Sequence, residues 1–161
     1  MRIFYWLATL VAVLDRATKI WATTALPQTD VIRLWPGVLE LKHAVNHGMA
    51  LGIMSGNWLA SLVLPIMAVC LWLWMTRQYE STPFKRCAAA LILGGFLGNF
   101  IDRLLFGHVV DMILFPWMPW FVCNVADIAI CAGVGMLVAS LLFRPGDWRE
   151  KHEEGKPEGQ T

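Results

Sequence analysis

Long stretches without a charged residue divide this chain. No Asp, Glu, Lys or Arg occurs in three stretches, which are residues 43–76, 87–101 and 128–143. An α-helix needs about 20 mostly apolar residues to cross a hydrocarbon core roughly 30 Å thick. The pattern therefore predicts four membrane-spanning helices, near residues 3–22, 58–76, 87–104 and 124–143.

The segment between the first two predicted helices, residues 23–57, is too long for a simple turn. Within it, Val31–Leu34 and Val38–Lys42 alternate loosely between apolar and polar residues, around Pro36 and Gly37. This pattern is typical of a β-hairpin. The expected fold is thus mainly α and integral to the membrane, with a small extracytoplasmic β element.

The two ends of the chain carry different signals. The first predicted helix has the basic start and apolar stretch of a signal peptide, but it runs into Asp15–Lys19 without an A-x-A cleavage site, so we expect a retained helix. From Pro145 the sequence is polar and mixed in charge, which is typical of a mobile tail. The predicted organisation is a membrane domain over 1–144, with 23–57 inserted between its first two helices, and a cytoplasmic tail over 145–161.

Composition agrees with a membrane protein. Of the 161 residues, 57% are hydrophobic and 16% are charged, and the mean hydropathy is +0.54, whereas a soluble domain is about 45–50% apolar and about 25% charged. Nine Trp residues fit membrane–water interfaces, and Trp117 and Trp120 are typical of an interfacial anchor. A net charge of +1 gives no bulk attraction to nucleic acid, so no nucleic-acid partner is expected.

The distribution of Lys and Arg predicts the orientation. Eight basic residues fall on one side of the predicted helices, namely Arg2, Arg77, Lys85, Arg86, Arg144, Arg149, Lys151 and Lys156. Three fall on the other side, namely Arg33, Lys42 and Arg103. Short cytoplasmic loops are enriched in Lys and Arg, so both termini are predicted to be cytoplasmic and the segments around 23–57 and 105–123 to face the outside.

Neither the cysteines nor the histidines form a strong motif. No CxxC spacing occurs among Cys70, Cys87, Cys123 and Cys131. We expect small buried side chains rather than disulfides. His43 and His47 have a spacing that suits a metal on a helix, but Gly48 indicates a non-helical segment, where hydrogen bonding is the favoured role. No metal site or cofactor is predicted.

Polar residues inside the predicted helices repeat at helical spacings. Asp15 and Lys19 are four residues apart and share a helix face, which predicts an ion pair, a role beside an active-site cavity, or both. Gly94 and Gly98 have the GxxxG spacing that lets helices approach closely. Beside them runs a polar stripe of Gly95, Asn99, Asp102 and Arg103. The stripe predicts a helix that faces a polar cavity, with a structural clamp as the alternative role for its two charged members.

Two carboxylates lie near the same predicted membrane face, Asp111 in the outer segment and Asp127 at the start of the last predicted helix. Asn124 and Asp127 fit the N-cap and N3 positions of that helix, where the helix dipole favours a carboxylate. Capping does not explain Asp111. Two carboxyl groups that share a proton can deprotonate a water while protonating a carbonyl, so aspartic-protease chemistry is a hypothesis for this pair.

Taken in order, these motifs resemble those of the lipoprotein signal peptidases (signal peptidase II), which are integral-membrane aspartic endopeptidases of bacteria. The resemblance covers about residues 10–135. It rests on Asp15–Lys19 (D-x-x-x-K), Asn46–Gly52 (N-x-G-x-A-x-G/S), Gly94–Arg103 (G-G-x-x-G-N-x-x-D-R), Val109–Asp111 and Asn124–Asp127. Each motif is weak alone, but five in order are specific.

The resemblance implies roles for individual residues. Asp111 and Asp127 would be the catalytic pair that activates water at the scissile peptide bond. The site would be lined by Asn46, Gly95, Asn99, Arg103 and Asn124. Asp15 and Lys19 would support the site from the first helix, and 23–57 would form the small β cradle of the family.

The resemblance also implies a substrate and a setting. The substrate would be a prolipoprotein whose lipobox Cys carries diacylglycerol, cleaved just before that Cys without a cofactor. The enzyme would be a monomer in the bacterial cytoplasmic (inner) membrane, surrounded by phospholipid, with its site facing the periplasm. Four apolar residues depart from those more common in the family and bear on substrate fit, namely Met49, Leu51, Met112 and Cys123.

Two other functions are compatible with charged residues in membrane helices. A small ion- or proton-coupled transporter subunit would also place Asp, Lys and Arg there, but it predicts polar residues spread through the bilayer depth. Here they gather toward the outer ends of the predicted helices. An inactive scaffold with the same fold is the third hypothesis.

Overall fold

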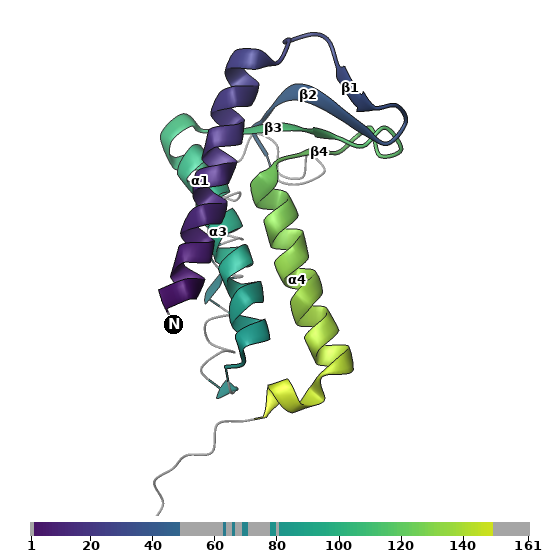
Figure 1. The fold of residues 1–161 in the computed structure, drawn as a ribbon. Helices are drawn as coiled ribbons and strands as arrows, with labels where there is room; N and C mark the ends of the chain where they lie inside the picture. The colour runs from purple at the N-terminus through teal and green to yellow at the C-terminus, as the bar shows by residue number, and fades with distance from the viewer. Residues whose placement is uncertain are drawn as a thin grey trace, which may run out of the picture.

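The computed structural model describes residues 2–48 and 81–149, together with positions 63, 66, 69, 70, 78 and 79. Within these residues, three long helices run alongside one another and a small sheet lies across one end of them (Figure 1). Apart from four single positions, the predicted helix near 58–76 lies outside the described residues, as do residues 150–161 of the tail.

The long helices are α1 (Arg2–Ala25), α3 (Pro83–Phe106) and α4 (Val125–Phe143), and they occupy three of the four predicted ranges. α3 begins earlier than predicted because the Thr82 side chain caps the backbone N–H of Lys85 and Pro83 takes the first helical position. α3 ends at Phe106 and is capped by Gly107, whose φ of 73° favours glycine. Among the described helices, α3 and α4 are long and apolar enough to cross a membrane.

The predicted close approach of helices at the glycines of α3 is confirmed. A Cβ atom on Gly94 would lie 2.5 Å from the carbonyl oxygen of Ala8 in α1, and one on Gly98 would lie 2.5 Å from the Asp15 carboxylate. On the side of α3 that faces α4, a Cβ atom on Gly95 would collide with the Ala126 backbone. These glycines bring three helices close enough for polar side chains to meet.

The sheet has the antiparallel order β1-β2-β3-β4. Its strands are β1 (Ile32–Trp35), β2 (Leu39–Asn46), β3 (Val109–Leu114) and β4 (Val122–Cys123). The predicted hairpin is confirmed as β1 and β2, but the sequence did not indicate β3 or β4. Because β3 has buried or half-buried residues on both faces, it lacks the apolar–polar alternation of a half-exposed strand.

The last turn of α1 anchors the sheet to the helices. Ala22 and Leu26, at the end of α1 and just beyond it, form a small buried cluster with Met112 of β3. Met112 is one of the departures from the residues common in the family, and it serves here as a core side chain. This contact fixes β3, and with it Asp111, relative to α1.

The start of the tail is packed, so the prediction of a mobile tail is wrong for its first four residues. They form a short 3₁₀ helix, η2 (Pro145–Trp148), in which Asp147 is buried. The Ser140 hydroxyl donates to Asp147 Oδ2 at 3.0 Å, and the Lys85 ammonium donates to the Asp147 carbonyl oxygen. These contacts join α3 and α4 at the end opposite the sheet. The four cysteines are free thiols, but the expectation that they are buried holds only for Cys123, because Cys70 and Cys131 are exposed and Cys87 is half-buried.

Candidate active site

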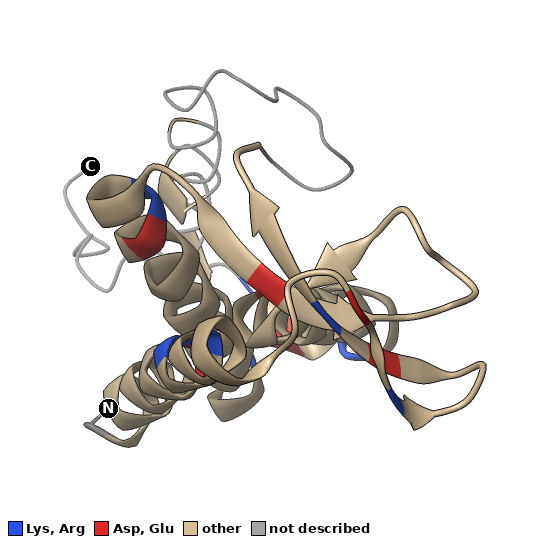
Figure 2. Ribbon diagram, turned by 90° about the horizontal axis from the view of Figure 1, so that it is seen from above, with Lys and Arg blue, Asp and Glu red and all other residues tan. Residues whose placement is uncertain are grey.

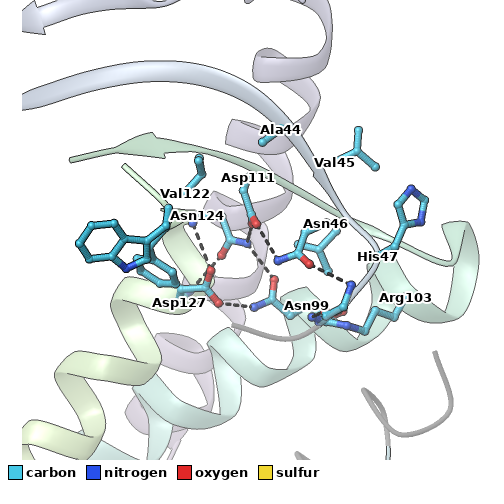
Figure 3. A pocket seen from close by; sticks show the side chains of 14 residues that line it. Ala44, Val45, Asn46, His47, Asn99, Arg103, Asp111, Val122, Asn124 and Asp127 are labelled. Atoms are coloured by element: carbon cyan, nitrogen blue, oxygen red, sulfur yellow. Dashed lines mark hydrogen bonds between the residues drawn. The ribbon is translucent and has the colours of Figure 1, made fainter. Parts of the chain in front are cut away.

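A cavity of about 330 Å³ lies between the sheet and the adjoining ends of α3 and α4 (Figure 3). Its lining includes both predicted catalytic residues and most of the residues predicted to line the site, namely Asn46, Asn99, Arg103, Asp111, Asn124 and Asp127. The sheet contributes Asp111 and Asn46, whereas the helices and the N-cap of α4 contribute the others. Segments that are far apart in the sequence therefore meet at one cavity.

Asp111 lies in β3 and is only 2% exposed. Its Oδ2 accepts a hydrogen bond from the Asn46 amide at 2.9 Å, and its Oδ1 accepts one from the Asn124 amide at 2.6 Å. Burial, together with the negative charge of Asp127, raises the pKa of Asp111 to about 6, although the two amide hydrogen bonds act in the opposite direction. This carboxyl group therefore keeps a proton to a higher pH than an ordinary Asp.

Asp127 lies in the first turn of α4 and is only half-buried. Its Oδ1 accepts a hydrogen bond from the Asn99 amide at 2.8 Å, and its Oδ2 accepts the backbone N–H of Asn124 at 3.3 Å. The Asn124 side chain in return accepts the Asp127 backbone N–H at 2.9 Å, which completes the predicted capping box. The cap thus fixes the Asp127 carboxylate at the edge of the cavity.

The Asn124 side chain links the two carboxyl groups. Its oxygen caps the backbone of Asp127, and its amide nitrogen reaches Asp111 Oδ1 and, at 3.1 Å, Asn99 Oδ1. Figure 3 shows this side chain beside both carboxyl groups, within one continuous chain of hydrogen bonds. The pair is therefore held by neutral amides, which orient the carboxylates without neutralising them.

Arg103 holds the backbone that follows β2. Its guanidinium donates to the Gly48 carbonyl at 2.9 Å and to the Asn99 backbone carbonyl at 3.2 Å. The Gly48 N–H donates to Asn46 Oδ1 at 2.9 Å, which turns the amide nitrogen of Asn46 toward Asp111. Arg103 therefore lines the cavity and acts as the clamp that was the alternative prediction.

Behind the cavity, Lys19 is completely buried among acceptors. Its ammonium lies 2.6 Å from Asp15 Oδ2, 2.8 Å from Asp102 Oδ2 and 2.8 Å from Asn99 Oδ1. Because an ammonium only donates, it must face the oxygen of the Asn99 amide. The amide nitrogen of Asn99 consequently points to Asp127. The predicted ion pair is confirmed, and it supports the site without lining the cavity.

Asp15 also contacts α4 directly. Its Oδ1 accepts the backbone N–H of Ala126 at 2.9 Å, so a carboxylate of α1 satisfies a free amide in the first turn of α4. Asp102 points away from the cavity and pairs with Arg16 at 3.0 Å as well as with Lys19. Together these contacts connect α1, α3 and α4 at the level of the site.

Other predicted residues lie elsewhere. Gly95 lies in the contact between α3 and α4 and is not among the residues lining the cavity. His43 lies in β2, so it is not helical, and the described residues contain no group of three or more His, Cys, Asp or Glu placed to hold a metal. The sequence motifs did not indicate Phe121 or Val122, which form an apolar wall of the cavity together with Trp120 of the predicted interfacial anchor.

Three comparisons place this architecture among known proteins. Residues 7–143 match the family model described as signal peptidase (SPase) II. Similar proteins named lipoprotein signal peptidase include one from Syntrophotalea carbinolica, 36% identical over 155 residues and 92% of each chain. Another, from Pseudomonas putida, is 36% identical over 146 residues and 84% of each chain. A bacterial membrane enzyme solved by the in meso method at 2.3 Å has a TM-score of 0.79 and 29% identity, covering 97% of this chain and 96% of that one.

Proposed function

Because the chain belongs to the signal peptidase II family, we propose that Asp111 and Asp127 are the catalytic pair with which it removes signal peptides from prolipoproteins. The chain is a membrane peptidase of the aspartic class. The observation that carries the assignment is the meeting of two carboxyl groups at one cavity, linked through the Asn124 side chain.

The surroundings of the two carboxyl groups suggest different roles. Asp111 is buried and has a pKa raised to about 6, so it is the proposed holder of the proton that is donated to the scissile carbonyl oxygen. Asp127 is more exposed to the cavity and lies in the first turn of a helix, where the dipole stabilises negative charge. It is the proposed base that takes a proton from the attacking water.

The reaction then follows from these roles. The water oxygen attacks the carbonyl carbon, while Asp127 accepts the water proton and Asp111 gives its proton to the carbonyl oxygen. When the resulting tetrahedral intermediate collapses, the C–N bond breaks, Asp127 passes its proton to the departing amine, and Asp111 recovers a proton from the hydroxyl. The amides of Asn46, Asn99 and Asn124 hold both carboxyl groups in place throughout.

The substrate class proposed for this site is a prolipoprotein whose lipobox Cys carries diacylglycerol, cleaved just before that Cys. The cavity combines a polar floor with an apolar wall of Trp120, Phe121 and Val122. Peptide hydrolysis requires the polar side, whereas lipid-modified Cys is compatible with the apolar side. The residues Met49 and Leu51, which bear on substrate fit, lie outside the described part of the chain.

We further propose four membrane helices over 1–144, with both termini cytoplasmic and the site at the periplasmic face of the inner membrane. α1 supports this placement because it exposes large apolar side chains, including Ile3, Trp6, Leu10 and Val13. Seen from above, Lys, Arg, Asp and Glu occupy few positions, and most of the ribbon is uncharged (Figure 2). A monomer surrounded by phospholipid is the proposed working form. The transporter alternative has no support from the comparisons, which all concern peptidases or a membrane enzyme.

Cleavage of a diacylglyceryl-modified lipobox peptide in detergent tests the catalytic pair. Asp111→Asn and Asp127→Asn each remove an acid–base group, so each variant is expected to lose at least about 10²-fold in rate. Asp30→Asn is a matched control because Asp30 is exposed and distant in sequence from both catalytic residues. If a folded Asp111→Asn or Asp127→Asn variant cleaved as fast as the control, the assignment would be wrong.

A further inference from the structure

Lys19, Asp15, Asp102 and Asn99 form a buried ion network. A second cavity, of about 270 Å³, lies on the other side of this network from the active site. It is bounded by the last turns of α1, the end of α3 and strands β2 and β3. Lys19 and Asp102 line it, while Lys19 also bonds to Asn99 of the active-site cavity. The ion network thus separates two cavities, and the peptidase reaction uses only one of them.

Arg16 lies on the part of α1 that exposes apolar side chains. Leu14 and Ile20 are exposed nearby, and the Arg16 side chain is 42% exposed. Among the described residues, its guanidinium makes one ion pair, from Nη1 to Asp102, and it stacks 4.7 Å from the ring centroid of Phe106. Since a guanidinium has five N–H groups, most of its donors have no protein partner in the described part of the chain.

The contact with Phe106 sets the depth of this charge. Phe106 is the last residue of α3, so the guanidinium lies where α3 ends, on the side of the sheet. With α3 crossing the membrane as proposed above, this level corresponds to the lipid headgroups. An Arg side chain that faces lipid is costly unless its charge reaches the headgroup region or pairs with an anion.

His43 supplies an independent sign of a missing partner. Its Nε2 atom is buried and makes no hydrogen bond to any described residue. A buried polar atom without a partner costs free energy, and such atoms are few in native proteins. His43 lines the same cavity as Arg16.

The remaining lining combines apolar side chains, which are Ile20, Phe106 and Val110, with the polar side chains of Thr23, Thr24 and His108. A free inorganic anion would leave the apolar side chains without a complementary ligand. An amphiphile with an anionic head and an apolar body matches both parts of the lining. Its phosphate would lie at Arg16 and His43, and its glycerol and upper acyl chain would lie against the apolar side chains.

We propose that this second cavity binds the phosphate group of an anionic phospholipid from the outer leaflet. The proposal rests on the membrane placement of α1 and α3 under the proposed function, but not on the catalytic pair. It assigns a specific lipid site to Arg16 and His43, which the peptidase reaction does not use. Lipid bound there would contact the same ion network that orients Asn99.

Native mass spectrometry of the full chain in detergent tests the proposal, with dioleoyl-phosphatidylglycerol as the probe. The unmodified protein, called the parent below, is expected to bind one lipid molecule saturably. Arg16→Gln is expected to lower the affinity for that lipid about tenfold or more. Arg144→Gln is the matched control, because Arg144 is 48% exposed, pairs with Asp147 at 3.3 Å and stacks 4.7 Å from Phe84, but does not line this cavity. Equal binding by the parent and Arg16→Gln would overturn the site.

Two further arms make the test decisive. His43→Leu removes the unpaired nitrogen and is also expected to weaken lipid binding. If Arg16→Gln does not fold, His43→Leu replaces it in the test, and unchanged lipid binding by His43→Leu would then refute the proposal. Inorganic phosphate that displaced the lipid at equal concentration would overturn the lipid assignment in favour of a simple anion site. Asp111→Asn is expected to bind the lipid like the parent, which separates this proposal from the catalytic one.

Discussion

Replacing Lys19 with Met is expected to destabilise the protein strongly. Met keeps most of the volume of the Lys side chain but removes the ammonium that lies among Asp15, Asp102 and Asn99. The Lys19 side chain is 0% exposed, so water cannot replace it without rearrangement. The change therefore leaves two buried carboxylates without their common partner.

The size of the effect follows from what those carboxylates retain. Removing one partner of a buried ion pair costs about 3–5 kcal/mol. The cost is not doubled here, because Asp102 keeps Arg16 at 3.0 Å and Asp15 keeps the Ala126 N–H at 2.9 Å. We therefore expect Lys19→Met to lower the free energy of unfolding by about 3–5 kcal/mol. Adding Asp15→Asn removes the uncompensated charge and is expected to restore about 1 kcal/mol or more.

Unfolding in mixed micelles of SDS and a mild detergent, followed by circular dichroism, measures these differences. Lys42→Met is the control, because Lys42 is exposed on β2 and its replacement is expected to change stability by less than about 0.5 kcal/mol. The reasoning fails if Lys19→Met is as stable as Lys42→Met. It also fails if the double variant is less stable than Lys19→Met alone.

Two further outcomes are expected. Asn46→Ala removes a hydrogen-bond donor that stabilises the ionised form of Asp111, so the pKa of Asp111 is expected to rise above about 6. The alkaline limb of the pH profile of kcat/KM then moves to higher pH. A move to lower pH would contradict the proposed proton on Asp111. Gly98→Ala places a Cβ atom 2.5 Å from the Asp15 carboxylate and is expected to cost about 1–3 kcal/mol in the same unfolding assay. Gly135→Ala meets nothing within 4 Å and is expected to be neutral or to stabilise by up to about 1 kcal/mol, so equal effects at the two glycines would refute the packing argument.

The parts of this structure that depend on neighbours in the sequence could be predicted. The capping box of Asn124 and Asp127 and the ion pair of Asp15 and Lys19 each lie within one helical turn, so their spacing is sufficient to indicate them. The hairpin of β1 and β2 is also local, because its turn residues lie between its two strands. The order and spacing of the motifs then led, through a family resemblance, to the proposed catalytic residues.

The parts that depend on distant segments could not be predicted from the pattern. β3 pairs with β2 from more than sixty residues away, and both of its faces are covered, so it gives no alternating signal. Asp102 and Asn99 lie on one helix, yet Asp102 turns to Arg16 of α1 while Asn99 faces the cavity. Which face of a helix meets which neighbour is decided by tertiary packing and not by helical spacing.

The hydrogen bond from Ala126 to Asp15 has a consequence for the order in which the enzyme is made. It joins two residues 111 positions apart, one in α1 and the other at the start of α4. In the proposed arrangement of four membrane helices, α1 enters the membrane long before the ribosome reaches α4, which carries Asp127. The nascent chain therefore has no assembled pair of aspartates until α4 has been inserted. With Asp111 and Asp127 in their proposed roles, proteolytic activity begins only after that step.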